Sequence, residues 1–189
     1  MEISAAQRRL LEAAVDAFAE HGFGGTTTRD IARRAGRSPA AVYVHHASKE
    51  TLLYVISLEG HTAALSCLQR AFDSCADPEA RLRAMVSEFS AWHLDHARLG
   101  RVIQYELHAL SDEHRAEILA LRREFQSLMV AALDDGIAAG SFDVEDVDGT
   151  ARALLSLCID LARWFDPALS RHPQALARLN ADLALRMVR

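Results

Sequence analysis

The chain has 189 residues, half of them hydrophobic, which is enough for one large or two small domains with a substantial core. Its net charge of −5 argues at first against a nucleic-acid partner. Three cysteines without a C-x-x-C pair argue against a disulfide framework and a structural zinc site. With no secretory leader and no apolar run of membrane length, we expect a cytoplasmic protein without a membrane partner.

A first helix is predicted from its capping residues and its apolar spacing. Ser4 and Gln7 have the spacing of a capping box, so the helix begins directly after Ser4. Apolar residues then recur every three or four positions from Leu11 to Phe18, which predicts one buried face. Gly22 is expected to end the helix.

Two shorter helices follow the first and have the pattern of a helix-turn-helix. Thr27 caps the first of them, which Gly36 stops. Ser38 caps the second, which carries Pro39 in its first turn and ends near His46. Short helices joined by a tight glycine turn are typical of this motif, so the sequence predicts a three-helix head over residues 1–48.

The rest of the chain reads as helix almost without interruption. Breaks at proline, glycine and serine positions separate predicted helices at residues 48–74, 78–97, 99–109, 112–138, 145–165 and 173–188. We therefore expect an all-α fold of about nine helices. In it, the head joins through a shared fourth helix to an all-helical second domain over residues 49–189.

The head is locally basic within an acidic chain. Residues 1–50 carry seven Arg or Lys against six Asp or Glu, whereas residues 51–189 carry fourteen against twenty. Four of the seven lie between residues 29 and 37: Arg29, Arg33, Arg34 and Arg37. Because salt screens charges beyond about 8–10 Å, this local density is what a DNA backbone responds to.

The stretch from Leu11 to Leu53 resembles the TetR family of bacterial transcriptional regulators. The matching residues are Ala14, Phe18, Gly22, Phe23, Thr26, Thr27, Ile31, Ala32, Ala35, Gly36, Ser38, Val42, Tyr43, His45, Ser48, Lys49, Glu50 and Leu52. Arg37, Pro39 and His46 depart from the pattern. The resemblance implies a homodimeric regulator, most often a repressor, whose residues 49–189 bind a small molecule and dimerise.

The resemblance also implies how the head binds an operator. The third helix enters the major groove, and Arg37 is the best candidate for a guanine contact, worth about 1–3 kcal/mol. Tyr43, His45 and Lys49 are expected to touch phosphates, so Lys49→Ala should weaken binding to all sequences and flatten the salt dependence. The expected DNA-binding residues are Thr27, Thr28, Arg29, Arg37, Ser38, Pro39, Ala40, Ala41, Tyr43, His45 and Lys49.

Dimerisation is expected on the last two long helices, which the family pairs as a four-helix bundle. Their apolar residues are Ala151, Leu154, Leu155, Cys158, Ile159, Ala162, Leu176, Leu179, Leu183 and Met187. Small residues among them would let the helices approach closely. The alternative is that these stripes face their own domain's core.

Large and adaptable side chains indicate a small-molecule pocket in the second domain. The expected effector-binding residues are Phe89, Trp92, His93, His96, Tyr105, Phe125, Met129 and Trp164; core packing is the alternative for each. The segment around Trp164 resembles that of family members that sense acyl-CoA or fatty acids. An acyl-type ligand would then place its anionic end near one of four bases: Arg101, Arg122, Arg123 or Arg163.

Different classes of function have weaker support in the sequence. No G-x-S-x-G elbow, Walker loop or H-E-x-x-H occurs, so we expect neither an enzyme nor a cofactor. His93 and His96 lack a third ligand at a convincing spacing, so no metal site is expected, although a metal sensor stays an alternative. A helical adaptor and a transcriptional activator also stay open as functions of this chain.

Overall fold

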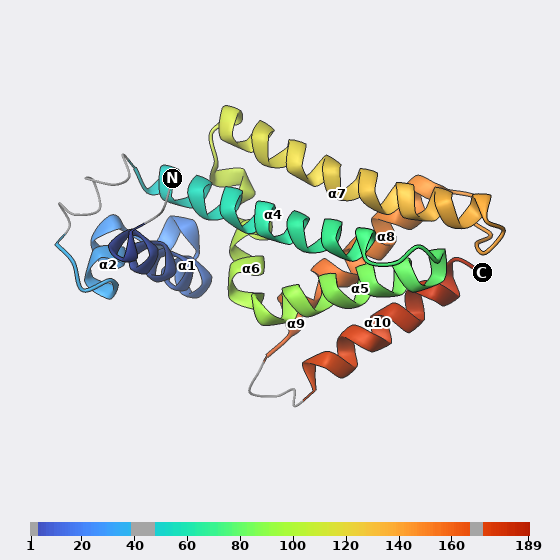
Figure 1. Ribbon diagram of the computed structural model, residues 1–189. Coiled ribbons are helices and arrows are strands. Elements are labelled where there is room, and N and C mark those ends of the chain that lie inside the picture. The colour runs from blue at the N-terminus through green and yellow to red at the C-terminus, as the bar shows by residue number, and fades with distance from the viewer. Residues whose placement is uncertain (1–3, 39–47, 167–171) are drawn as a thin grey trace. The chain divides into compact units, whose positions relative to one another are not determined.

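The computed structural model of the protein describes residues 4–38, 48–166 and 172–189 (Figure 1). The helices are α1 Ala5–Gly25, α2 Thr28–Arg34, α4 Lys49–Asp73, α5 Pro78–Asp95, α6 Ala97–Tyr105, α7 Asp112–Ala138, α8 Val147–Ile159, α9 Leu161–Trp164 and α10 Pro173–Met187, with a 3₁₀ turn at Leu107–Ala109. These described residues contain no strand. The predicted all-α fold is confirmed.

The chain divides into two compact units. The first unit is Met1–His61 with Arg98–Ile118, and the second is Thr62–Ala97 with Leu119–Arg189. Helices α4 and α7 contribute residues to both units. The division does not coincide with the domain boundary expected at residue 48, which stays a prediction about the DNA-binding head.

In the first unit, α1 and α2 form where their caps predict them. Ser4 accepts a hydrogen bond from the Gln7 amide, and the Gln7 side chain accepts one from Ser4, which completes the capping box. Gly22 breaks the helical geometry with φ of +69°, although helical residues continue to Gly25. Gly36, with φ of +66°, follows the end of α2. The predicted third helix lies outside the described residues except for Ser38.

Helix α6 lies beside α4 in the first unit, and an ion pair connects it to α1. Arg98 Nη1 donates to Asp16 Oδ1 of α1 at 3.0 Å. On α4, a Cβ added at Gly60 would lie only 3.3 Å from the Ile103 side chain and 3.5 Å from that of Leu99. The absence of a side chain at Gly60 therefore allows α6 to approach α4 closely.

The second unit has one main apolar core, to which five helices contribute. α5 packs against both α8 and α10, and Figure 1 shows α10 (red) alongside α5 (green). At their centre, Asn180 Nδ2 donates to Ser90 Oγ at 3.2 Å and to the Leu157 carbonyl at 3.1 Å. The largest fully buried side chains of this core are Leu68, Leu82, Met85, Phe89, Met129, Leu133 and Leu154.

A close contact at Gly136 of α7 yields a stability prediction. A Cβ added at Gly136 would lie 1.9 Å from Cδ2 of the buried Phe142 ring. Gly136→Ala is therefore expected to lower the free energy of unfolding by about 1–3 kcal/mol, despite the better helix propensity of alanine. Urea denaturation measures this change.

The matched control for Gly136→Ala is Gly24→Ala, because a Cβ at Gly24 meets nothing within 4 Å. That substitution should leave the unfolding free energy unchanged or raise it slightly. A Gly136→Ala protein as stable as the wild type would show that Phe142 moves aside without cost.

The C-terminal helices differ from prediction in one place. The helix expected at residues 145–165 is divided at Asp160 into α8 and α9. Asp160 Oδ1 accepts a hydrogen bond from Arg163 Nε at 2.7 Å, so the Asp160 side chain is bonded to the short helix that follows it. The expected apolar stripe of α8 faces its own core, because Ala151, Leu154, Leu155 and Cys158 are buried there and Ala162 of α9 is buried too.

Helix α4 corrects an expectation about membrane-length segments. By length and composition alone it could cross a bilayer. The expectation that no apolar run reaches that length is therefore wrong for α4. Half of its most apolar stretch is buried inside the protein, which is typical of a core helix.

Candidate functional site

The start of α2 is built around Thr27, one of the expected DNA-binding residues. Its hydroxyl donates to Asp30 Oδ2 at 2.5 Å and accepts from the Asp30 amide at 3.2 Å, which closes a capping box. The Thr27 hydrogen bonds lower the pKa of Asp30. Thr28, also expected to touch DNA, is half-buried as the first residue of α2.

Of the four clustered arginines, two form ion pairs with acids of the head and two are exposed. Arg33 pairs with Asp30 at 2.6 Å, and Arg34 forms a two-pronged ion pair with Glu20 of α1. Arg29 and Arg37 are exposed, and neither forms an ion pair with any residue that the structure describes. The two that were expected to touch DNA are thus the two with no acid partner in the described head.

Five expected DNA-binding residues follow Ser38 in the predicted third helix. Pro39, Ala40, Ala41, Tyr43 and His45 lie outside the described residues. Their DNA-binding roles stay predictions.

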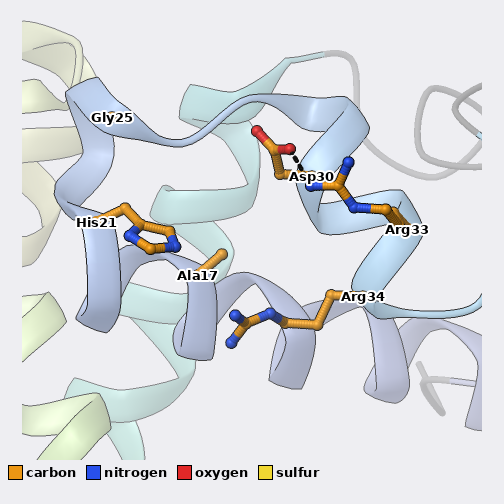
Figure 2. Close-up of a pocket in the computed structure, with 6 residues that line it drawn as sticks. All are labelled: Ala17, His21, Gly25, Asp30, Arg33 and Arg34. Carbon is orange, nitrogen blue, oxygen red and sulfur yellow. Dashed lines mark hydrogen bonds and ion pairs between the residues drawn. The ribbon is translucent and has the colours of Figure 1, made fainter.

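A cleft of about 480 Å³ lies between α1 and α2 (Figure 2). Its lining residues are Ala17, His21, Gly25, Asp30, Arg33 and Arg34. Figure 2 shows Arg33 turned toward Asp30 within α2. The Arg34 guanidinium forms its ion pair with Glu20. Because its charged groups already neutralise one another, the cleft offers no unmatched charge to a ligand.

Lys49, expected at a phosphate, points into the head instead. Its Nζ donates to the Phe23 carbonyl at 2.6 Å and to the Thr26 carbonyl at 2.8 Å. It also lies 4.1 Å from the centre of the Phe23 ring, within the range of a cation–π contact. These contacts connect the first turn of α4 to the end of α1.

The neighbouring Glu50 makes contacts that the sequence did not predict. Its Oε1 accepts from the Ser111 amide at 3.0 Å and pairs with His114 Nδ1 at 2.7 Å. One turn further along α4, Tyr54 stacks on the His114 ring with centres 3.7 Å apart and donates to Glu117. In the sequence, Glu50 stood out only as one of the residues that match the family, and that match does not indicate what Glu50 contacts.

Two of these groups, Glu50 and Tyr54, have pKa values shifted from their ordinary values. Burial acts to raise the pKa of Glu50, but the hydrogen bonds from Ser111 and His114 outweigh it, so the pKa is lowered. The hydrogen bond to Glu117 is the main cause that raises the pKa of Tyr54 to about 12. Glu50 is therefore an anion at neutral pH, placed at the N-terminus of α7 as well as in the first turn of α4.

The structure brings together most of the expected effector residues. Phe89, Phe125 and Met129 are buried in the core of the second unit, with the two phenylalanine rings 5.5 Å apart. Trp92 packs against that core. The exposed His96 ring stacks on the Trp92 ring with centres 4.6 Å apart. The packing alternative accounts for all three buried residues.

Two expected effector residues lie elsewhere. Tyr105 belongs to the first unit, where its side chain is 51% exposed. Trp164 is 52% exposed at the end of α9 and lies outside the buried cluster. Their roles in binding stay predictions.

His93 is a buried polar side chain within this aromatic cluster. Its ring lies nearly perpendicular to the rings of Phe89 and Trp92, with centres 4.5 and 5.0 Å apart, and Nδ1 lies 2.8 Å from the Phe89 carbonyl. Burial is the main cause that lowers the pKa of His93 to about 4. The neutral ring donates from Nδ1, which makes Nε2 a hydrogen-bond acceptor.

Metal ligation receives no support from the arrangement. In the ranges 4–38, 48–166 and 172–189, no three His, Cys, Asp or Glu side chains are placed to hold a metal ion. His93 and His96 each direct Nδ1 to a carbonyl of their own helix.

Comparison with known families matches both parts of the chain. Residues 10–55 match the model described as bacterial regulatory proteins, tetR family. Residues 75–188 match the tetracyclin repressor-like C-terminal domain.

Individual relatives extend the similarity over the whole chain. The transcriptional repressor KstR2 of Rhodococcus jostii is 30% identical over 185 residues, which is 96% of this chain and 90% of the relative. A tetR-family regulatory protein from Rhodococcus RHA1 has a TM-score of 0.92 and 42% identity over 98% of both chains. AibR, solved with isovaleryl coenzyme A and operator DNA, shares the fold with a TM-score of 0.82 and 23% identity over 96% of each chain.

Proposed function

Because this chain belongs to the TetR family of bacterial transcriptional regulators, we propose that it is a cytoplasmic repressor. It binds a palindromic operator as a homodimer and is released by a small apolar or acyl-type effector. The observation that carries the proposal is the head, in which Arg29 and Arg37 remain exposed beside a capped α2 while the other clustered arginines are paired. Residues 1–48 are its DNA-binding domain and residues 49–189 its effector and dimerisation domain.

The homodimer is supported by the exposed face of α10. Leu179, Leu183 and Met187 follow one another at four-residue spacing and are 51%, 36% and 46% exposed. A stripe of large apolar side chains on the surface is typical of an interface. The exposed positions of α8 include Ala153 and Ser156, whose small side chains suit a closely approaching helix.

An acyl-CoA thioester is the effector class that we favour. AibR was solved with one, and this core combines aromatic and thioether side chains with a neighbouring base. Arg122 lies three and seven residues before Phe125 and Met129, on the same face of α7. It is half-buried, and burial lowers the pKa of its guanidinium, whereas Arg123 is exposed. Arg122 is therefore our candidate for the anionic end of the ligand.

Release from DNA tests the proposal. A labelled duplex is first selected from random sequence by the wild-type chain, and isovaleryl-CoA is then titrated into the complex while fluorescence anisotropy is followed. We expect a loss of anisotropy with isovaleryl-CoA and none with free coenzyme A. If a series from short to long acyl-CoA thioesters neither releases the DNA nor raises the melting temperature, the effector class is wrong and DNA binding stands.

Arg122→Met is expected to raise the isovaleryl-CoA concentration needed for half release by about 10- to 100-fold. The reason is that a charge-assisted hydrogen bond contributes about 1.5–3 kcal/mol to binding. The control is Arg123→Met on the exposed side of the same turn, which should release like the wild type. Equal behaviour of the two variants would remove Arg122 from the site.

A further inference from the structure

The link between α1 and α2 leaves backbone carbonyls that need donors. The last turn of α1 contains no basic residue of its own. Gly22 interrupts its geometry, and the buried Thr26 hydroxyl bonds to the Ala17 and Gly22 carbonyls at 3.1 and 2.8 Å. From the backbone, the Phe23 carbonyl accepts a long hydrogen bond, of 3.3 Å, from the Thr26 amide. The negative end of α1 is thus open to a cation from elsewhere in the chain.

Lys49 supplies that cation. Its two hydrogen bonds, of 2.6 and 2.8 Å, satisfy the Phe23 and Thr26 carbonyls. Its position over the Phe23 ring adds a third contact, and that ring packs against the buried Phe18 with centres 5.5 Å apart. Two of the three ammonium donors are therefore used inside the head.

The position of Lys49 in the chain makes this contact consequential. Residues 39–47, which the sequence predicts to carry the recognition helix, connect Ser38 to Ser48. Ser48 caps α4, because its Oγ accepts from the Thr51 amide at 3.0 Å. The hydrogen bonds from Lys49 to the end of α1 therefore fix the position of Ser48 and the first turn of α4, directly after residues 39–47.

We propose that Lys49 is a positioning residue, which supports operator binding by fixing the first turn of α4 to the end of α1 and not by contacting a phosphate. This inference rests on the proposed DNA-binding function. It replaces the phosphate contact that the sequence suggests for Lys49, and the two roles respond differently to salt.

The salt dependence of operator affinity separates the two roles. Each phosphate contact contributes about −0.9 to the slope of log affinity against log salt. We expect Lys49→Ala to lower affinity for the selected duplex by about ten-fold at every salt concentration from 50 to 200 mM, with the wild-type slope. Arg29→Ala, in an exposed arginine, is the comparison expected to reduce the slope. A slope reduced by about 0.9 in Lys49→Ala would overturn the proposal.

Lys49→Gln guards against a general loss of structure. Its amide can donate to one of the two carbonyls but carries no charge. We expect Lys49→Gln to recover part of the affinity lost in Lys49→Ala and to keep the wild-type salt slope. A phosphate contact predicts a slope reduced by about 0.9 in Lys49→Gln as well, because the charge is lost.

A measurement without DNA tests the contact by itself. The Thr26 amide should exchange with solvent about ten-fold faster in Lys49→Ala than in the wild type, and at the wild-type rate in Arg29→Ala. Unchanged exchange in Lys49→Ala would refute the positioning role. If the wild-type chain selects no duplex, the proposed function fails, and the exchange result still decides whether Lys49 holds the head together.

Discussion

Replacing Leu179 and Leu183 together by glutamate is expected to leave the protein monomeric and to lower its operator affinity by about 100-fold or more. Both side chains lie on the exposed apolar stripe of α10, and two carboxylates there would be desolvated on pairing. A single head contacts one half-site, so the monomer loses the gain from binding both halves at once. Sedimentation velocity and anisotropy on the selected duplex measure the two effects.

The control for this pair is Arg178→Glu, an exposed residue of α10 off the stripe. The substitution adds negative charge to the same helix outside the apolar stripe, so the variant protein should remain dimeric. A dimer that survives both glutamates would place the interface on another face. A wild-type chain that sediments as a monomer at micromolar concentration would refute the dimer.

The stability of the second unit is expected to fall steeply between pH 6.5 and pH 4 because of His93. The pKa of His93 in the folded chain is about 4, below the 6.5 of an exposed histidine. The unfolded chain therefore binds the proton first as the pH falls, and unfolding becomes easier. The contribution of His93 is fully present above pH 6.5; about 2 kcal/mol of it is lost by pH 5 and about 3 kcal/mol by pH 4.

Urea denaturation of the wild type and of His93→Gln, at pH 7 and at pH 5, measures this loss. Carboxylates contribute to acid sensitivity in both proteins, so the difference between the two pH profiles isolates His93. His96→Gln, in the exposed neighbouring ring, should follow the wild-type profile. Parallel profiles for the wild type and His93→Gln would mean that the imidazolium is accommodated in the fold.

The helices were predictable because their signals are local. The Ser4 capping box, the Gly22 break and the predicted start at Pro78 all depend on residues within one or two turns, and the structure reproduces each of them. Helix α7 was predicted with the bounds that it has. The break at Asp160 was missed because the apolar pattern continues across it.

The candidate site was predictable only in part. Exposure of Arg29 agrees with its position outside the apolar stripe of α2, and exposure of Arg37 agrees with its place after the end of that helix. Exposure of Trp164 could not be foreseen, because its neighbour Phe165 is buried and the two are equally apolar in sequence. Which of two adjacent apolar side chains faces the core depends on the helices packed around them.

The sequence alone determined the all-α class, most helix boundaries and the family of the head, because capping, periodicity and motif spacing act over a few residues. Only the tertiary structure decided what Lys49 and Glu50 contact. Their partners lie 26 and 23 residues before Lys49 and 61 and 64 residues after Glu50. No local pattern encodes such pairs, since a charged side chain at a helix start can face solvent, DNA or a distant carbonyl, and only packing selects among them.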